Sequence, residues 1–236
     1  MIDFKTGALI VALAAAPLAA HASSVNFTDT FTGGASSHWQ SYTGSWAAHD
    51  GVYDAQYPNN NPLTLSSLDF NLQNASSFTF DVDVNSLADG GIWIDTDGTN
   101  QNGVLLVLGG SGYGPSNGAA GGHDIYWHIV QGGSVSGQLG LVGGVFTPGQ
   151  DYHLTVTASG GVYNAYVNGV FETSITNNIF SQGQVGLYDE WGPMTFDNVH
   201  LVGVDDAVPE PATWAMMILG MGGVGATMRR RSVALA

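Results

Sequence analysis

Short apolar runs with a period of two residues recur along this chain, and they constrain its fold more than any other feature of the sequence. In FTFDVDV, the side chains of Phe78, Phe80, Val82 and Val84 fall on one side of an extended chain, and the intervening Thr and Asp residues fall on the other. This alternation is typical of a strand with one face in a core and the other in water. The sequence therefore predicts half-buried β-strands.

Twelve runs rich in Val, Ile, Phe, Tyr and Thr are separated by Gly, Asn, Asp and Ser. We predict strands at residues 25–31, 51–56, 63–65, 77–84, 91–95, 103–108, 124–130, 151–158, 162–167, 170–174, 184–188 and 195–202. Asn168 and Gly169 suit the two positive-φ positions of a type I′ turn, so they predict a hairpin. Two Gly-rich segments, 109–122 and 131–144, predict long mobile loops. The expected fold class is an all-β, antiparallel β-sandwich.

The two ends of the chain differ from the rest in charge. The basic residues are Lys5 and three arginines at 229–231, and no Lys or Arg occurs between residues 23 and 208. All acids except Asp3 and Glu210 lie in this body, which gives it a charge of about −17 and makes it repel nucleic acid and anionic membranes. Calcium, polyols and sugars are compatible partners. The absence of cysteine excludes disulfides and thiol catalysis.

Residues 1–22 have the three parts of a secretory signal peptide. Lys5 precedes the apolar stretch 7–16, and small residues stand at Ala20 and Ala22, the two positions that a signal peptidase reads. We therefore expect an N-terminal signal helix, cleavage by signal peptidase after Ala22, and export across the inner membrane.

The C-terminal segment has an uncharged stretch, residues 214–228, followed at once by the arginines. As a helix starting at Thr213 it would cover roughly 24 Å, somewhat short of the hydrocarbon core of a bilayer, which is about 30 Å thick. Arginines beside an apolar span stay in the cytoplasm, so the body is expected outside. The sequence thus predicts a C-terminal transmembrane helix.

This segment, VPEPATWAMMILGMGGVGATMRRR, resembles the PEP-CTERM sorting signal of Gram-negative bacteria. The residues that carry the resemblance are Pro209, Glu210, Pro211, Trp214, Arg229, Arg230 and Arg231. The resemblance implies that a membrane-embedded exosortase recognises and processes the chain at the Pro-Glu-Pro motif. The protein would then leave its transient membrane anchor for the cell surface or the extracellular polysaccharide. A simple anchor that is never cut is the alternative.

The order of short cues in the body resembles laminin-G/concanavalin-like jelly-roll domains. These cues are FTDTF, GSW, YVNG, GQVGLY and FDNVHLV. The resemblance implies two antiparallel sheets with the first and last strands side by side. The expected domains are a signal peptide (1–22), a β-sandwich (23–204), a linker (205–208), the sorting signal with its transmembrane helix (209–231) and a cytoplasmic end (232–236).

The resemblance also implies calcium as a candidate cofactor, because domains of this shape often carry a calcium site. If the terminal strands are neighbours, Asp29 and Asp197 can converge on one hard cation. Asp95 and Asp97 in DTDGTNQNG offer oxygen ligands around a glycine turn, without the full pattern of an EF-hand loop. Turn caps and exposed strand edges explain the same residues without a metal.

Extracellular polysaccharide is a candidate partner, because aromatic rings stack on sugars while carboxylates accept hydroxyl hydrogens. Alternation places Tyr126 and Trp127 on opposite faces, so one of them is expected in the core. Packing in the core alone would also explain each aromatic residue among the candidates named next. The candidate ligand-binding residues are Trp93, Asp124, Tyr126, Trp127, Asp189, Glu190 and Trp191.

Catalysis has little support in the sequence, and no catalytic residue is assigned. A glycosidase needs two carboxyl groups flanking the bond that it cleaves. The Glu-x-Asp-x-x-Glu motif of family-16-like glucanases is absent. The body has only two glutamates, Glu172 and Glu190, and they are far apart in sequence. We therefore expect a non-catalytic structural or glycan-binding module. A polysaccharide-acting enzyme on the same fold is the alternative, and ice binding would need a repeated Thr array that the sequence does not show.

Overall fold

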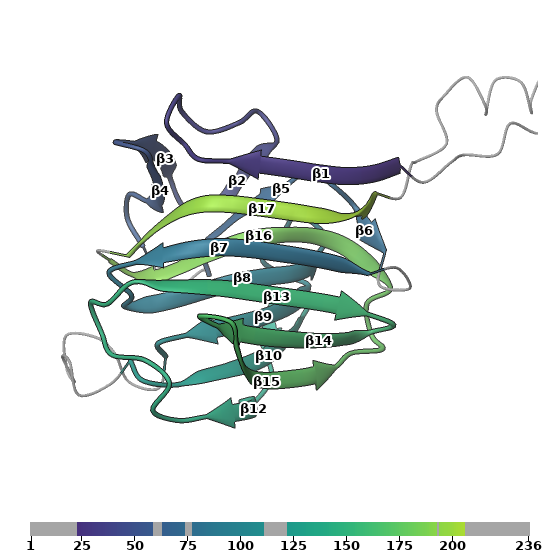
Figure 1. Cartoon of the computed structure of the whole chain (residues 1–236). Helices are drawn as coiled ribbons and strands as arrows, with labels where there is room; N and C mark the ends of the chain where they lie inside the picture. The colour runs from purple at the N-terminus through teal and green to yellow at the C-terminus, as the bar shows by residue number, and fades with distance from the viewer. Residues whose placement is uncertain (1–22, 59–62, 74–76, 111–121, 193, 206–236) are drawn as a thin grey trace, which may run out of the picture. The chain divides into compact units, whose positions relative to one another are not determined.

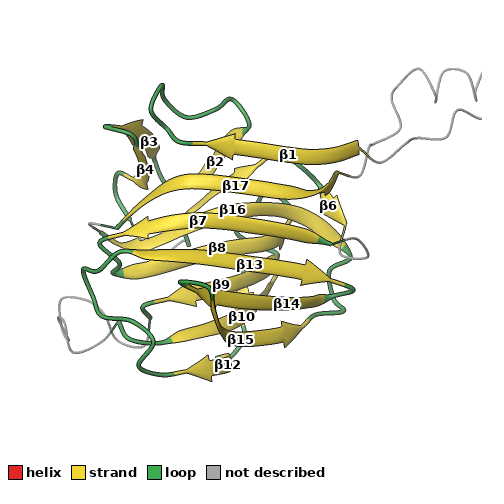
Figure 2. Cartoon of the chain, viewed as in Figure 1, coloured by secondary structure: helices red, strands yellow, loops and turns green. Residues whose placement is uncertain are grey.

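The computed structural model describes residues 23–58, 63–73, 77–110, 122–192 and 194–205. The regular secondary structure of these residues consists of β-strands (Figures 1 and 2). The predicted signal peptide, sorting signal and transmembrane helix lie outside these residues. Among the described residues, no helix has the length and hydrophobicity to span a membrane.

Six antiparallel strands form the first sheet. Their spatial order is β1 (Ser23–Asp29), β17 (Thr195–Asp205), β7 (Phe78–Asn85), β13 (Tyr152–Ser159), β14 (Val162–Val167) and β15 (Val170–Thr176) (Figure 1). The hairpin of β3 (Trp46–His49) and β4 (Val52–Ala55) joins this sheet where Tyr53 pairs with Phe196. The first and last strands are neighbours, as the jelly-roll resemblance implies.

The second sheet is also antiparallel. Its order is β2 (Trp39–Thr43), β5 (Leu65–Leu68), β16 (Gln182–Trp191), β8 (Asp89–Thr96), β9 (Gly103–Leu108) and β10 (Ile125–Gln131). Two short strands, β11 (Ser134–Val135) and β12 (Leu139–Val142), pair with β10. The short strand β6 (Leu72–Gln73) pairs with β16 and β17 and so links the sheets. The predicted antiparallel sandwich is confirmed.

The main core lies between the two sheets. All four apolar side chains of FTFDVDV are buried in it, which confirms the alternation predicted for β7. A second cluster lies on the other face of the second sheet, and it comprises Leu65, Trp93, Leu105, Val107, Tyr126, Val130 and Tyr188. Strands β8 and β9 are therefore buried on both faces, which explains why their sequences show no alternation.

The turn predictions had mixed outcomes. Asn168 and Gly169 have φ angles of 51° and 77°, which confirms the expected hairpin between β14 and β15. The prediction of a long mobile loop at residues 131–144 was wrong, because the segment contains β11 and β12. Gly140 on β12 allows this strand to lie close to β15, because a Cβ at Gly140 would lie 2.7 Å from Oγ1 of Thr173. Most of the other Gly-rich segment lies outside the described residues.

Candidate functional site

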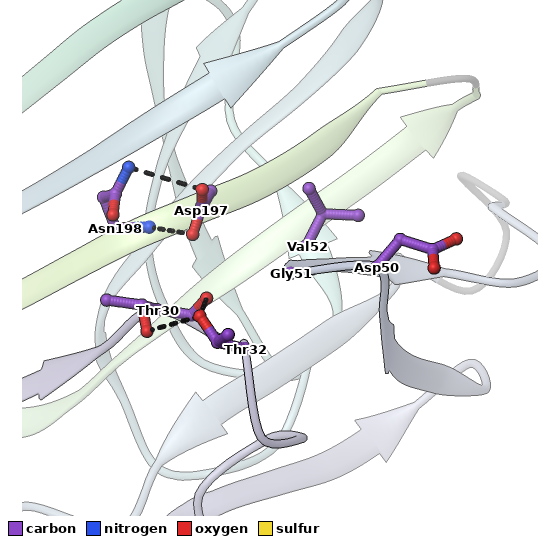
Figure 3. Close-up of a pocket in the computed structure, with 7 residues that line it drawn as sticks. All are labelled: Thr30, Thr32, Asp50, Gly51, Val52, Asp197 and Asn198. Atoms are coloured by element: carbon purple, nitrogen blue, oxygen red, sulfur yellow. Dashed lines mark hydrogen bonds between the residues drawn. The ribbon is translucent and has the colours of Figure 1, made fainter.

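A shallow polar pocket of about 740 Å³ lies at one end of the sandwich (Figure 3). Three chain segments build it: the loop after β1, the turn between β3 and β4, and the first part of β17. We call it the rim pocket, and its lining residues are Thr30, Thr32, Asp50, Gly51, Val52, Asp197 and Asn198. Most of these side chains carry oxygen atoms that accept hydrogen bonds, and the hydroxyl and amide groups among them also donate.

Asp29 shapes the loop after β1. Its carboxylate is buried and accepts hydrogen bonds from the backbone N–H of Phe31 (2.9 Å), the backbone N–H of Ser36 (2.8 Å) and Nε1–H of Trp39 (3.0 Å). These bonds hold Phe31 at a φ of 52°, a conformation that a bulky side chain rarely adopts. The ring of Phe31 then stacks on Tyr53.

The hydroxyls on either side of Phe31 line the pocket. The Oγ1 atoms of Thr30 and Thr32 lie 3.0 Å apart and are exposed (Figure 3). Inserting Phe31 into the core thus leaves its two polar neighbours on the surface.

The other two segments of the rim pocket also contain residues with positive φ angles. Asp50 and Gly51, with φ angles of 51° and 81°, form a two-residue turn between β3 and β4 that leaves the carboxylate of Asp50 in solvent. In β17 the pairing with β7 shifts between Asp197 and His200, and Asn198 has a φ of 50°. This irregularity turns Asp197 toward the pocket, where its Oδ1 accepts the N–H of Asn198 at 2.6 Å.

The structure places the two acids of the first predicted calcium site in different environments. Asp29 pairs with Val199 on the neighbouring strand, so the two segments are adjacent as expected. The carboxylate of Asp29 is engaged by the N–H groups of its own loop, whereas Asp197 lines the pocket. In the described part of the chain, no group of three or more His, Asp or Glu residues is arranged to hold a metal. Calcium at this site stays a prediction.

The acids of the second predicted calcium site also separate. Asp95 is buried, has a φ of 52°, and accepts hydrogen bonds from the hydroxyl of Tyr163 and the amide of Asn177. Asp97 is exposed and accepts from the backbone of Thr99 and, at 2.9 Å, from Asn102. Partial burial by itself would raise the pKa of Asp97, but the hydrogen bonds together outweigh burial, so the pKa is lowered. One acid therefore links the two sheets and the other stabilises its own turn.

The predicted aromatic platforms are enclosed by packing. Trp127 is fully buried in the main core, and Trp93 is fully buried in the second cluster with its Nε1–H donated to the carbonyl of Thr64. Tyr126 also belongs to the second cluster, so it lies on the opposite face from Trp127, as alternation indicates. Asp124 is partly exposed and accepts the N–H of Gly144 at 3.2 Å.

A group of three acids lies on β8 and β16, and the sequence analysis missed one of them, Asp89. Gly90 pairs with Asp189 in the register of these strands, so Asp89 is brought close to Asp189 and Glu190. Asp89 is only 5% exposed, and burial, together with the charges of Glu190 and Asp189, raises its pKa to about 8. The hydroxyl of Tyr188 donates to Oε2 of Glu190 at 2.6 Å, and burial raises the pKa of Glu190 in spite of this bond.

This acid group places Asp89, a carboxyl group with a raised pKa, beside two further acids, and paired carboxyl groups are the equipment of general acid–base chemistry. No lysine or arginine of the body is available to neutralise it. The side chain of Trp191, which was predicted beside these acids, is not among the described side chains.

Sequence reasoning found Asp197 but not the rest of the rim pocket. Asp50-Gly51 is a turn signal that could have been recognised. No comparable signal marks the irregularity at Asn198 or the inward rotation of Phe31, because both depend on strand pairing and loop hydrogen bonds.

Comparison with solved structures places the body among jelly-roll sandwiches. It is similar to a carbohydrate-binding module, CBM66, from Bacillus subtilis, with a TM-score of 0.52, 16% identity, and coverage of 71% of this chain and 95% of that one. A Bacillus subtilis protein with a galectin-like fold gives a TM-score of 0.54 at 8% identity, covering 76% and 96%. A proposed glycosyl hydrolase from Parabacteroides distasonis gives 0.51 at 16% identity, covering 74% and 92%. At these identities the likeness shows the fold alone.

The C-terminal segment has its own match. Residues 207–231 match the family model of the PEP-CTERM protein-sorting motif. No curated protein sequence matches the chain. The chain therefore joins a PEP-CTERM sorting motif to a jelly-roll body, and the motif indicates a protein that is exported and processed by an exosortase.

Proposed function

We propose that this chain is a non-catalytic glycan-binding module that an exosortase releases from a transient membrane anchor to the cell surface or the extracellular matrix. The observation that carries the proposal is the rim pocket, which combines carboxylate, hydroxyl and amide groups on a carbohydrate-binding-like fold. These groups are the hydrogen-bonding partners of sugar hydroxyls. The pocket volume of about 740 Å³ lies within the usual range for small-ligand sites.

The charge of the body narrows the ligand. Asp50 and Asp197 line the pocket, and the body has no Lys or Arg to pair with an anionic sugar. A uronate or phosphate group placed in the rim pocket would meet like charge at short range. The ligand proposed for this pocket is therefore a neutral glycan.

Calorimetric titration of the full chain, purified in detergent, against neutral and uronate-rich extracellular polysaccharides tests this proposal. A hydrogen bond to a charged group contributes about 1.5–3 kcal/mol, so Asp50→Ala should weaken binding of a neutral glycan by about tenfold or more. Glu172→Gln, on β15 away from the pocket, is the matched control and should bind like the wild type. If no polysaccharide binds, only a structural role is left.

The acid group of Asp89, Asp189 and Glu190 favours a second candidate function, hydrolysis of a polysaccharide. A glycosidase uses one protonated and one ionised carboxyl group, and burial raises the pKa values of Asp89 and Glu190. The test is release of reducing sugar from extracellular glycans by the full chain. Product release that Glu190→Gln abolishes and Glu172→Gln leaves unchanged would replace the non-catalytic proposal with an enzyme.

A further inference from the structure

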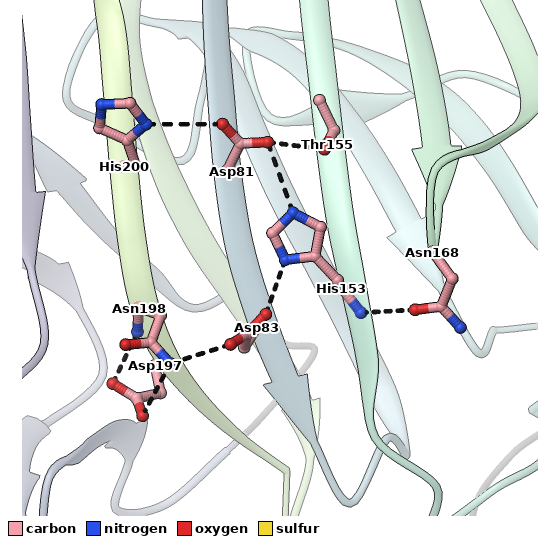
Figure 4. A network of polar contacts seen from close by, with 8 residues as sticks. All are labelled: Asp81, Asp83, His153, Thr155, Asn168, Asp197, Asn198 and His200. Carbon is pink, nitrogen blue, oxygen red and sulfur yellow. Dashed lines mark hydrogen bonds and ion pairs between the residues drawn. The ribbon is translucent and has the colours of Figure 1, made fainter.

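A line of polar contacts leads from the rim pocket across three strands of the first sheet (Figure 4). Asp197 on β17, Asp83 on β7 and His153 on β13 lie opposite one another in the register of these strands, so their side chains share one face of the sheet. Asn198, which lines the rim pocket, donates an Nδ2–H to Oδ2 of Asp83 at 2.9 Å. On its other side, Oδ1 of Asp83 lies 2.7 Å from Nδ1 of His153. The line therefore starts in the rim pocket and reaches β13.

A second, smaller hollow lies along this line. Its volume is about 240 Å³, and we call it the middle hollow; its lining residues are Asp83, Asn85, Asp151, Tyr152 and His153. Asp83 thus lines the middle hollow and is also hydrogen-bonded to a residue of the rim pocket. Like the rim pocket, the middle hollow offers carboxylate and amide groups, which are the hydrogen-bonding partners of sugar hydroxyls.

The contacts within the line leave its carboxylates able to accept further hydrogen bonds. A carboxylate has about four acceptor sites, and the contacts with His153 and Asn198 occupy one on each oxygen of Asp83. The side chain of Asp83 is 33% exposed, so a ligand can reach it. Asp151 accepts the backbone N–H of Ser86 on Oδ1 at 2.8 Å. Because these bonds hold the acids in place, less conformational entropy is lost when a ligand binds to them.

The line continues to an exposed aromatic pair. The backbone N–H of His153 donates to Oδ1 of Asn168, in the turn between β14 and β15, at 2.9 Å. Beside this turn, the rings of Tyr166 and Phe171 meet edge to face with their centroids 5.7 Å apart. Phe171 is 53% exposed, and Val170 next to it is also exposed. The exposed ring offers apolar contact area to the faces of sugar rings.

The aromatic pair lies on the same face of the sheet as the polar line. Tyr166 pairs with Thr155, which pairs with Asp81, and Asp81 and Asp83 are two residues apart on β7. Neighbouring strands are about 4.8 Å apart, so the surface from β17 to β15 spans about 19 Å. A disaccharide is too short to cover this length, whereas an extended glycan chain covers it.

The charges of this surface narrow its occupant. Acids line both hollows, and the body, with a charge of about −17, has no Lys or Arg. A second copy of the body, a nucleic acid or an anionic sugar would therefore meet like charge. An uncharged chain that combines hydroxyl groups with apolar ring faces matches both the polar line and the aromatic pair.

We propose that the rim pocket is one part of a longer binding surface, on which an extended neutral glycan runs from the rim pocket over the middle hollow to the Tyr166–Phe171 pair. The inference rests on the proposed glycan-binding function. It adds that the ligand is a stretch of several sugars within a polymer, and not a single sugar held in the rim pocket alone.

The length of the glycan tests this inference. The probe is the neutral polysaccharide that binds in the titration described above, used as disaccharide and octasaccharide fragments with the full chain in detergent. The octasaccharide should bind about tenfold more tightly than the disaccharide, or better, because it alone reaches from the rim pocket to the aromatic pair.

Two variants separate the ends of the surface. Phe171→Ala should weaken the octasaccharide by about fivefold or more and leave the disaccharide unchanged, because it removes apolar contact area at the far end. Asp50→Ala should weaken both fragments. The matched control is Tyr42→Ala, which removes a ring of similar exposure (55%) on β2 in the other sheet and should change neither affinity.

Equal melting temperatures of Phe171→Ala and the wild type would show that the fold is intact. Equal affinity of the two fragments, or an octasaccharide affinity that Phe171→Ala leaves unchanged, would overturn the inference and leave the rim-pocket proposal standing. If Phe171→Ala instead changes the oligomeric state and not the affinity, the aromatic pair is a contact between copies and the inference is wrong. If no polysaccharide binds, both proposals fail.

Discussion

Asp89 is a buried acid in a body that has no lysine or arginine to stabilise its charge. Burial, with smaller contributions from Glu190 and Asp189, raises its pKa to about 8. The folded protein therefore holds a proton on this carboxyl group at neutral pH, whereas the unfolded chain does not.

The consequence is a stability that falls with rising pH. Because the pKa of Asp89 is higher in the folded state than in the unfolded chain, its contribution to the free energy of unfolding is fully present at a pH below the ordinary Asp range. This contribution is lost as the pH rises toward about 8. Each pKa unit corresponds to about 1.4 kcal/mol, so the free energy of unfolding should drop by about 2 kcal/mol or more between pH 5 and 8. Denaturant titrations at both pH values measure this drop.

Asp89→Asn should flatten that dependence, because the amide does not titrate. Asp69→Asn is the matched control, since Asp69 is an exposed acid on the surface. If the Asp89 variant and the wild type lose the same free energy between pH 5 and 8, the carboxyl group is not protonated in the folded protein.

At the scale of elements, the loop after β1 shows how one side chain shapes the rim pocket. Asp29 accepts three N–H groups, and each would lose its acceptor if the carboxylate were removed. An unsatisfied buried donor costs about 1–3 kcal/mol, so Asp29→Ala should lower the free energy of unfolding by about 3 kcal/mol.

The control for this change is Asp69→Ala, which removes an exposed pair with His38 and should cost less than about 1 kcal/mol. Chemical denaturation of both variants measures the difference. Equal stability of the two variants would mean that the Asp29 hydrogen bonds do not hold the loop.

The strands themselves were largely predictable from the sequence. All twelve predicted runs overlap strands, because each pairs apolar alternation or a buried apolar run with flanking turn residues. The run 63–65 overlaps β5 only at Leu65. The strands that were missed are β2, β3, β6, β11 and β12. They are short or contain polar and glycine residues, so their pairing depends on neighbours that are distant in sequence.

The candidate sites were less predictable than the strands. Adjacency of Asp29 and Asp197 followed from the pairing of the terminal strands, but the direction of each carboxylate depends on local hydrogen bonds. Likewise, Trp93 resembles a sugar platform in sequence, yet both faces of β8 are buried. Burial on a second face is a property of the whole sandwich, and no local pattern reports it.

At the scale of the whole molecule, charge separates the chain into an anionic body and basic ends. The sorting motif at residues 207–231 contains all three arginines, and the remaining basic residue is Lys5 in the predicted signal peptide. Processing at both ends would leave a sandwich without Lys or Arg outside the cell. Such a surface repels anionic membranes and nucleic acid.

Fractionation of producing cells, with mass spectrometry of the recovered protein, tests this account most directly. We predict a chain that begins at Ser23, ends near the Pro209-Glu210-Pro211 motif, and elutes with the extracellular polysaccharide. A full-length chain, uncut at both ends and recovered from the cytosol, would contradict the account.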